Sequence, residues 1–486
     1  MLLSAQEWSI NYQGSHPSGR THFRDGFIDE DGVTFLAGQE GPDDDTPETL
    51  FMRIEPDGNH SEFLYQKTGC RSKATCILEM QDHNLFVAGN LYDDTDDYVM
   101  VLILDKQLNL LEERQYEKET EALAFGQCKA TTDSHGNVIV STSVLQNNGP
   151  SSVCNHGVFY KFDEHGNLIS HRYLIEDYPS PLYYLMDFQM QQMWYDAEAE
   201  NLLCLVPGFG NIMSFITFDS AFNYIEEYPI WRDDPEKLDH SLFLDCYTDH
   251  WYSNDEALFF SSYGDYHCNK LRVSRINTHG EFLEYIHLNE RTDTIDDPAR
   301  PRCMATANDS TFYFSFFYHT LECFPGIACI YLLNDRLEII GRHLDDEHDR
   351  YRSSIILPTN DGGCITVIDS CDYFLTVNTS HPVIKKLTRQ DFEQVSCSLA
   401  PCGHAPSHHG AYPNPCETSL YIPMPNNGDN IQCHVFDNHG RTIINRTVNP
   451  HGNTLVLDVS KLKKGVYHYR IYSNKETLLT DTFIKK

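Results

Sequence analysis

The chain has 486 residues, and its 71 Asp and Glu outnumber its 36 Lys and Arg, giving a formal net charge of −35. So large an acidic excess argues against a basic face that would bind nucleic acid or an anionic membrane. The apolar stretches, such as residues 311–318, have the length of a strand. We therefore expect no membrane-spanning helix.

The first eight residues, MLLSAQEW, contain few apolar residues and no basic segment. They resemble the end of a signal peptide, with cleavage near Ala5 or Gln6, and we expect the reading frame to begin further upstream. This remnant and an N-terminal strand at residues 8–12 make up residues 1–20. In a closed ring an early strand completes the last repeat and covers two sheet edges, although residues 391–397 compete for the same position.

Residues 157–174, GVFYKFDEHGNLISHRYL, have the pattern of a β-hairpin. Aromatic and branched residues flank a turn at residues 164–167, where Gly166 suits a positive φ. The pattern recurs six times, most weakly in the last copy: residues 50–65, 100–116, 214–228, 270–288, 328–344 and 383–395.

A second kind of hairpin, in which a polar turn leads into an apolar strand, precedes each of these copies. It occurs seven times, at residues 28–38, 79–89, 131–142, 195–208, 253–264, 307–317 and 358–369. Two hairpins in each period of about 50 residues make a four-stranded meander, and repeated meanders bury their faces by closing into a β-propeller. The sequence therefore predicts an all-β fold with a seven-bladed β-propeller over residues 21–400.

The connections at the two ends of each predicted meander differ in length. Turns at one end, here called the turn face, are tight, whereas connections at the other end, here called the loop face, are long, as in residues 229–245 and 287–302. Because long loops on a rigid scaffold concentrate binding residues, we predict a ligand site on the loop face. Its candidates are Tyr92, Asp93, Tyr183, Tyr184, Trp231, Arg232, Tyr266, His267, Arg300, Arg302, Arg350 and Tyr351.

These residue types suit a glycan or a peptide or protein ligand. Aromatic rings stack on apolar faces, and charged groups fix the orientation of a ligand. The alternative interpretation is that the loops are polar because they are solvated.

The 16 cysteines include no C-x-x-C pair, which argues against a zinc ribbon or a redox motif. Four of them precede a polar turn at equivalent places, and we predict that they are core residues: Cys76, Cys128, Cys246 and Cys303. In an oxidising compartment four pairs could form disulfides: Cys70 with Cys76, Cys323 with Cys329, Cys364 with Cys371 and Cys397 with Cys402.

Familiar catalytic motifs are missing from the sequence, including the S-x-D-x-G-x-x-W box, G-x-S-x-G, H-E-x-x-H, G-x-G-x-x-G and the P-loop. The many Asp residues of the loops could act in pairs in a glycoside hydrolase or lyase, but their abundance makes this signal weak. We expect no cofactor and no dedicated metal site, with a weakly held surface cation as the alternative. Soft ligands at Cys402, His404, His408 and His409 lie in a Pro- and Gly-rich segment whose composition favours a spacer.

After a linker at residues 401–411, residues 412–486 alternate apolar and polar positions over about seven short strands. This pattern predicts a separate, Ig-like β-sandwich. Its motifs are Tyr412-Pro413-Asn414-Pro415, a Val435-Phe436-Asp437 strand ending at Gly440-Arg441, Leu457-Asp458-Val459-Ser460, Gly465-Val466-Tyr467 and Lys485-Lys486. In their order and spacing, these motifs resemble the type A C-terminal sorting domain of type IX secretion in Bacteroidota.

The resemblance implies that type IX secretion machinery carries the folded protein through the outer membrane and removes the tail. The cargo is then released or attached to surface lipopolysaccharide. The propeller is similar, more loosely, to repeats of Bacteroidota surface proteins. We therefore expect a secreted or cell-surface binding or scaffold protein without enzymatic activity. The alternatives are a carbohydrate-active enzyme working on the loop face and an adhesin-like module with protein contacts.

Overall fold

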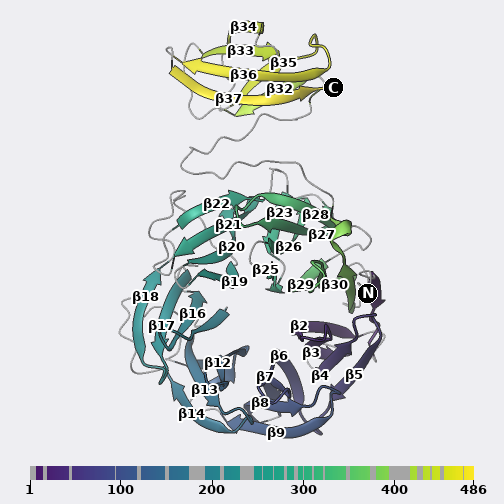
Figure 1. The fold of residues 1–486 in the computed structure, drawn as a ribbon, viewed down its shortest axis with the longest axis vertical. Coiled ribbons are helices and arrows are strands. Elements are labelled where there is room, and N and C mark those ends of the chain that lie inside the picture. Colours follow the sequence, from purple (N-terminus) through teal and green to yellow (C-terminus); the bar gives the residue numbers. More distant parts are fainter. Residues whose placement is uncertain are drawn as a thin grey trace. The chain divides into compact units, whose positions relative to one another are not determined.

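The computed structural model divides the chain into two compact units, Met1–Pro401 and Cys402–Lys486 (Figure 1). Across the described residues the elements are β-strands and one 3-10 helix, Arg389–Asp391, which confirms the all-β prediction. None of these elements is a helix long and apolar enough to cross a membrane. The structure describes residues 7–14, 19–42, 46–93, 95–117, 122–147, 153–174, 192–207, 213–229, 246–253, 256–265, 268–277, 282–288, 294–298, 300–308, 311–320, 323–345, 351–372, 379–392, 416, 418–423, 431–437, 441–448, 454–473 and 476–486.

Five sheets of the first unit are antiparallel meanders whose strands follow the order of the chain. Figure 1 shows them succeeding one another around a ring. Their strands are β6 (Arg71–Glu79), β7 (Leu85–Tyr92), β8 (Asp97–Leu104) and β9 (Leu110–Glu117); β10 (Ala122–Phe125), β11 (Lys129–Thr132), β12 (Val138–Asn147), β13 (Val153–Phe162) and β14 (Leu168–Tyr173); β15 (Gln192–Asp196), β16 (Asn201–Pro207), β17 (Met213–Asp219) and β18 (Tyr224–Pro229); β19 (Cys246–Ser253), β20 (Glu256–Asp265), β21 (Cys268–Asn277) and β22 (Phe282–His287); and β23 (Thr294–Pro298), β25 (Met304–Asn308), β26 (Thr311–Thr320), β27 (Cys323–Asn334) and β28 (Ile339–Asp345).

A nine-stranded sheet joins the beginning and the end of the first unit. It contains two meanders, linked by a parallel contact between Arg20 and Ser380. The predicted succession of meanders is confirmed, whereas the number of seven blades stays a prediction because these two share one sheet. The strands are β1 (Trp8–Asn11), β2 (Arg20–Ile28), β3 (Thr34–Gly41), β4 (Glu48–Ile54), β5 (His60–Tyr65), β24 (Arg300–Arg302), β29 (Tyr351–Pro358), β30 (Cys364–Asp372) and β31 (Thr379–Leu387).

The N-terminal strand completes the last meander. β1 runs antiparallel to β31, with Trp8 opposite Lys386 and Ile10 opposite Ile384, which confirms the role predicted for residues 8–12. The predicted hairpin at residues 383–395 is wrong in its second half, because a capping box at Thr388 starts the 3-10 helix Arg389–Asp391 instead. Residues 393–397 lie outside the described part of the chain.

The hairpin turns repeat one backbone geometry with different residues. Gly166 has a φ of +74° after β13, and Leu108, Phe222 and Leu337 also have positive φ at the equivalent positions. L-residues rarely adopt this conformation. These three side chains are at most 4% exposed, so their burial offsets the backbone strain.

The hydrophobic core of the first unit lies in layers between consecutive sheets. Phe86 of β7 packs against Phe162 of β13 with ring centroids 5.2 Å apart, and Phe260 of β20 packs against Phe314 of β26 at 5.3 Å. Fully burying one such side chain contributes about 1.5–3 kcal/mol. Each sheet is therefore stabilised by its neighbours in the ring.

The cysteines contribute to this core as predicted where they are described. Cys76, Cys128 and Cys303 are buried free thiols, whereas the side chain of Cys246 lies outside the described part. The suggested disulfides are not formed in three of the four pairs, because one or both members are free thiols: Cys70, Cys76, Cys329 and Cys364. The fourth pair, Cys397 with Cys402, is not described.

The second unit contains two sheets that share one core. β32 (Ser419–Pro423) pairs with β35 (Thr454–Asp458), and the other sheet has the order β34 (Thr442–Val448), β33 (Ile431–Asp437), β36 (Gly465–Ser473) and β37 (Glu476–Lys485). Leu457, Val435 and Tyr469, from both sheets, are buried in a single cluster. The described residues thus form a two-sheet unit with six strands where about seven were predicted.

Candidate functional site

Acidic residues of the turn face stabilise its tight turns. Asp163 Oδ1 accepts hydrogen bonds from the backbone N–H groups of His165 and Asn167, and Oδ2 accepts one from Asn167 Nδ2. Burial opposes ionisation of Asp163, but these hydrogen bonds outweigh it and lower the pKa of the carboxyl group. Three further turns use the same pair of acid and amide: Asp105 with Asn109, Asp133 with Asn137 and Asp219 with Asn223.

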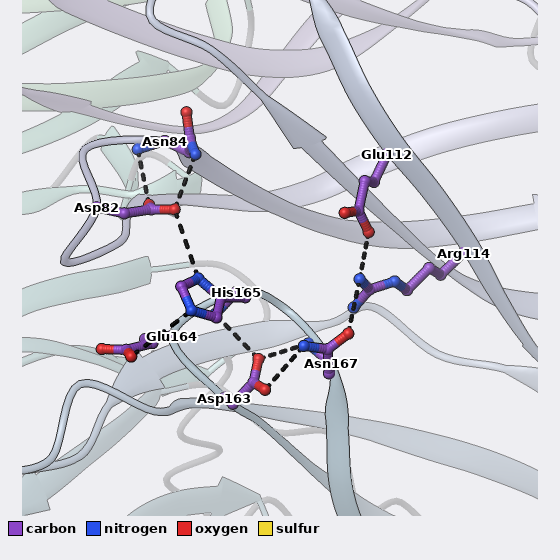
Figure 2. Close-up of polar contacts among 8 residues, drawn as sticks. All are labelled: Asp82, Asn84, Glu112, Arg114, Asp163, Glu164, His165 and Asn167. Carbon is purple, nitrogen blue, oxygen red and sulfur yellow. Dashed lines mark hydrogen bonds and ion pairs between the residues drawn. The ribbon is translucent and has the colours of Figure 1, made fainter.

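The turn that contains Asp163 also contacts the preceding sheet (Figure 2). Figure 2 shows His165 beside Asp82 of the turn between β6 and β7, with 4.0 Å between His165 Nδ1 and Asp82 Oδ2. Arg114 of β9 donates through Nη2 to Asn167 Oδ1 at 3.0 Å. Asn84, Glu112 and Glu164 are further members of this network. These polar contacts connect two sheets, and we assign them to the fold.

The structure describes five of the predicted loop-face residues: Tyr92, Asp93, Arg300, Arg302 and Tyr351. They belong to two sheets, with Tyr92 and Asp93 at the end of β7 and the other three in β24 and β29. The remaining candidates lie outside the described residues: Tyr183, Tyr184, Trp231, Arg232, Tyr266, His267 and Arg350.

Tyr92 and Asp93 lie at the start of the loop that follows β7. Asp93 Oδ1 accepts hydrogen bonds at 2.7 Å from the hydroxyl and backbone N–H of Thr95 and from the N–H of Asp96. The Thr95 hydroxyl, followed by the two backbone donors, lowers the pKa of Asp93 to about 2. Lys73 Nζ lies 6.0 Å from the centroid of the Tyr92 ring, and burial raises the pKa of this phenol. The Asp93 carboxylate thus stabilises the turn that follows β7.

Arg302 performs a structural role between two distant strands, β24 and β2, of the nine-stranded sheet. Its Nη1 lies 3.2 Å from Asp25 Oδ1 and also donates to the carbonyl oxygen of Gly26, in the first strand of the first meander. The other carboxylate oxygen of Asp25 accepts the backbone N–H of Ile77 in β6 at 3.0 Å. Asp25 therefore links β2, β24 and β6, which belong to two sheets, and Arg302 forms contacts that hold the fold together.

Beside β1, a buried polar contact joins the first and last meanders. Tyr12 donates its hydroxyl to Glu40 Oε2 at 3.0 Å, and its backbone N–H donates to the carbonyl of Pro382 at 3.1 Å. Tyr12 is 7% exposed and Glu40 is 1% exposed, so a polymeric ligand cannot reach either group. Burial, followed by the nearby carboxylates of Glu62 and Glu40, raises the pKa of Tyr12.

The turn face carries a cavity of about 200 Å³ where the first and last meanders meet at β1. Its apolar wall consists of Trp8, Ile28, Pro56 and Ile365. Trp8 is held by a hydrogen bond from Nε1 to the carbonyl of Pro56 at 3.1 Å. Polar residues of two equivalent turns form the rest of the lining: Glu30, Asp31 and Gly32 after β2, and Thr359, Asn360 and Asp361 after β29. Lys386 of β31 completes it.

The one lysine of the cavity lining is paired with an acid. Lys386 Nζ lies 3.0 Å from Asp361 Oδ2, and Asp361 also accepts from the Thr359 hydroxyl. Burial opposes ionisation of Asp361, but the contacts with Thr359 and Lys386 lower its pKa. Because the charges of Lys386 and Asp361 cancel, the net negative charge of the cavity lining comes from Glu30 and Asp31.

Sequence reasoning missed this cavity because it favoured long loops. The cavity forms from short turns that become neighbours only when β1 closes the first and last meanders together. One available signal was the predicted closing role of residues 8–12, which places Trp8 beside the turns at residues 29–32 and 359–362.

In the second unit, the described motif residues Gly465 and Tyr467 belong to the larger sheet, whereas Leu457 and Asp458 belong to β35 of the smaller one. Gly465 begins β36 opposite Lys485, and Tyr467 stacks on Phe483 of β37 at 5.5 Å while donating its hydroxyl to the carbonyl of Lys463. Arg441 directly precedes β34 and is exposed. The motif residues Tyr412, Pro413, Asn414, Pro415 and Gly440 lie outside the described part.

Among the described residues, no group of three or more His, Cys, Asp or Glu side chains is arranged to hold a metal ion. The segment with Cys402, His404, His408 and His409 is not among the described residues.

Residues 410–486 match the family model of the secretion system C-terminal sorting domain. The match lies within the second unit and confirms the resemblance of its motifs to a C-terminal sorting domain of type IX secretion. It implies export to the cell surface or secretion. No curated protein matches the chain.

Solved structures with low sequence identity resemble the chain in three dimensions. They include a fungal alcohol oxidase of the AA5 family in complex with copper, with 11% identity, 99% of each chain covered and a TM-score of 0.45. The polysaccharide lyase Uly1 has 10% identity, with 76% of this chain and 90% of that chain covered and a TM-score of 0.44. The Dos1 propeller has 11% identity, 85% and 90% coverage and a TM-score of 0.37. These scores are too low to support an inference about activity.

Proposed function

We propose that the chain is a binding or scaffold protein of the cell exterior, exported by type IX secretion through the sorting domain at residues 412–486. The observation that carries the proposal is the family match over residues 410–486, together with the two-sheet unit that these residues form. A cleaved signal peptide upstream of Trp8 brings the chain to the periplasm of a Bacteroidota cell. The tail is removed after passage through the outer membrane.

The binding function belongs to a seven-bladed propeller at residues 21–400, which a linker at residues 401–411 joins to the sorting domain. The count of seven takes the nine-stranded sheet as two blades, β2 to β5 and β29 to β31 with β1, beside the five separate meanders. Closure by β1 supports this division, since an N-terminal strand on the last meander leaves its outer edge covered.

Two described carboxyl groups, Asp361 and Glu40, give no support to the alternative of a carbohydrate-active enzyme. Hydrolysis of a glycoside requires one carboxyl group that stays protonated as a general acid. Contacts with Thr359 and Lys386 instead favour the ionised form of Asp361 in the cavity. Glu40 on the loop face is too deeply buried to reach a glycosidic bond. We therefore advance no enzymatic function.

Export is tested by expressing the full chain with its upstream signal in a Bacteroidota host that has type IX secretion. Fractionation is expected to place the protein outside the cell without residues 410–486, and deletion of those residues is expected to retain it in the periplasm. A reporter carrying a signal peptide and residues 410–486 is the positive control. Retention of the full chain inside cells that export the reporter would contradict the proposal.

A further inference from the structure

The cavity beside β1 has the size of a single side chain. Clefts that enclose drug-sized ligands measure about 300–1,000 Å³, whereas this cavity measures about 200 Å³. An extended glycan would therefore exceed it, and a flexible aliphatic group with one polar end would fit. Five places in the sequence, at residues 8, 28–32, 56, 359–365 and 386, supply its walls.

The cavity combines an apolar wall with an acidic rim. Trp8, Ile28 and Ile365 can contact methylene groups, and an indole ring also attracts a cation placed over its face. On the rim, the described residues provide no hydrogen bond or ion pair to the side chains of Glu30 and Asp31. Both side chains are exposed and available to a ligand.

The charge of the first unit favours the same kind of ligand. Residues 1–401 contain 65 Asp and Glu against 27 Lys and Arg, a formal charge of −38, whereas residues 402–486 contain six against nine, a charge of +3. A negative potential of this size raises the local concentration of cations and repels anions. Since Lys386 is already paired with Asp361, it does not offset Glu30 and Asp31.

We propose that this cavity binds one basic side chain, lysine or arginine, of a peptide or protein partner. The methylene groups lie along Trp8, Ile28 and Ile365, and the ammonium or guanidinium group lies between Glu30 and Asp31. The assignment rests on the proposed binding function and gives it a ligand class, and it places the site on the turn face instead of the loop face.

The test is calorimetric titration of the purified full chain with N-acetyl-lysine methylamide and N-acetyl-arginine methylamide. Saturable binding with a dissociation constant of about 1 mM is expected, falling severalfold between about 0.02 and about 0.2 M salt. N-acetyl-norleucine methylamide, which lacks the charge, is expected to bind at least about tenfold more weakly.

The double variant E30Q/D31N is expected to weaken binding of the charged probes about tenfold. A matched control is E112Q/E164Q, which removes two carboxylates from another part of the turn face and is expected to change affinity by less than about twofold. Equal affinity for norleucine, equal loss in both double variants, or no saturation by about 50 mM probe would overturn the proposal. Because the purified protein is titrated, these outcomes do not depend on whether export follows the proposed route.

Discussion

Arg302 and Asp25, separated by 277 positions in the sequence, meet at 3.2 Å between Nη1 and Oδ1. The same guanidinium group donates to the carbonyl of Gly26, and Asp25 accepts the backbone N–H of Ile77. The contact therefore ties β24 to the first strand of the first meander and, through Asp25, to the next meander. Local sequence patterns contain no information about such a contact.

Substituting Arg302 with methionine is expected to lower the free energy of unfolding by about 1–3 kcal/mol, because the Gly26 carbonyl and the Asp25 carboxylate each lose a charged donor. The side chains are 33% and 23% exposed, and solvent screening favours the lower end of that range. Urea unfolding of the full chain measures the change. R336M, which removes an exposed arginine from the turn after β27, is the control, and equal losses in both variants would contradict the assigned role.

The closing contact of Tyr12 with Glu40 gives a second prediction. Y12F removes the hydroxyl donor from a carboxylate that is 1% exposed, so we expect a loss of about 1.5–3 kcal/mol of stability. Y228F makes the same chemical change at an exposed pair, Tyr228 with Glu226 at 2.8 Å, and is expected to alter stability by less than about 0.5 kcal/mol. Both variants are compared by denaturant unfolding. A loss of stability in Y12F as small as in Y228F would show that the buried pair does not stabilise the contact between the first and last meanders.

The acid–amide turns predict how stability depends on pH. The pKa values of Asp105, Asp133, Asp163 and Asp219 are lowered in the folded protein: burial opposes ionisation, but hydrogen bonds from Asn109, Asn137, Asn223 and Lys161 among others outweigh it. The ionised form is therefore favoured by folding, and its contribution is complete above the unfolded pKa of about 3.9. It is lost as the pH falls through the lower folded pKa.

Denaturant unfolding is expected to give falling stability from about pH 5 downward. In D163A, which removes one of these carboxylates, stability at pH 7 is expected to fall by about 0.5–1.5 kcal/mol and its acid dependence to become shallower. H135A changes a side chain of an equivalent turn without removing its acid and serves as the control. An unchanged pH profile in D163A would argue against the role of the acid in the turn.

Most of the fold could be predicted because its units are local. An apolar run, an acid followed four residues later by an amide, and a second apolar run specify a hairpin such as residues 157–174 without reference to the rest of the chain. The same holds for the sorting domain, whose motifs follow one another at fixed spacing.

The candidate site could not be predicted in the same way. Trp8, Glu30 and Asp361 become neighbours only after the N-terminal strand pairs with β31. The amino-acid composition of a short turn does not indicate whether it lines a cavity. Conversely, Asp93 and Arg302 looked like ligand residues because they are polar and lie near long loops. In the structure, Asp93 accepts hydrogen bonds from backbone N–H groups of its own turn, and Arg302 donates to a residue of a distant strand.

The buried thiols predict a pattern of chemical reactivity. Burial raises the pKa of Cys128 to about 12 and also raises that of Cys76, so little thiolate is present in the folded state. At pH 8, iodoacetamide is expected to modify Cys70, which is partly exposed, and to leave Cys76, Cys128 and Cys303 unmodified until denaturant is added. Peptide mass spectrometry distinguishes these sites. Rapid modification of Cys128 in the native protein would contradict its place in the core.

The sorting domain offers a test in which two neighbouring residues of one strand differ in burial. Leu457 is fully buried, whereas Val456 beside it is 41% exposed. L457A is expected to destabilise the second unit by about 2–5 kcal/mol through the cavity that it leaves, and V456A by less than about 0.5 kcal/mol. Differential scanning calorimetry of the full chain should then show a lower transition temperature for the second unit in L457A, with the transition of the first unit unchanged. If the two variants behave alike, or if both transitions shift together, the two units do not have separate cores.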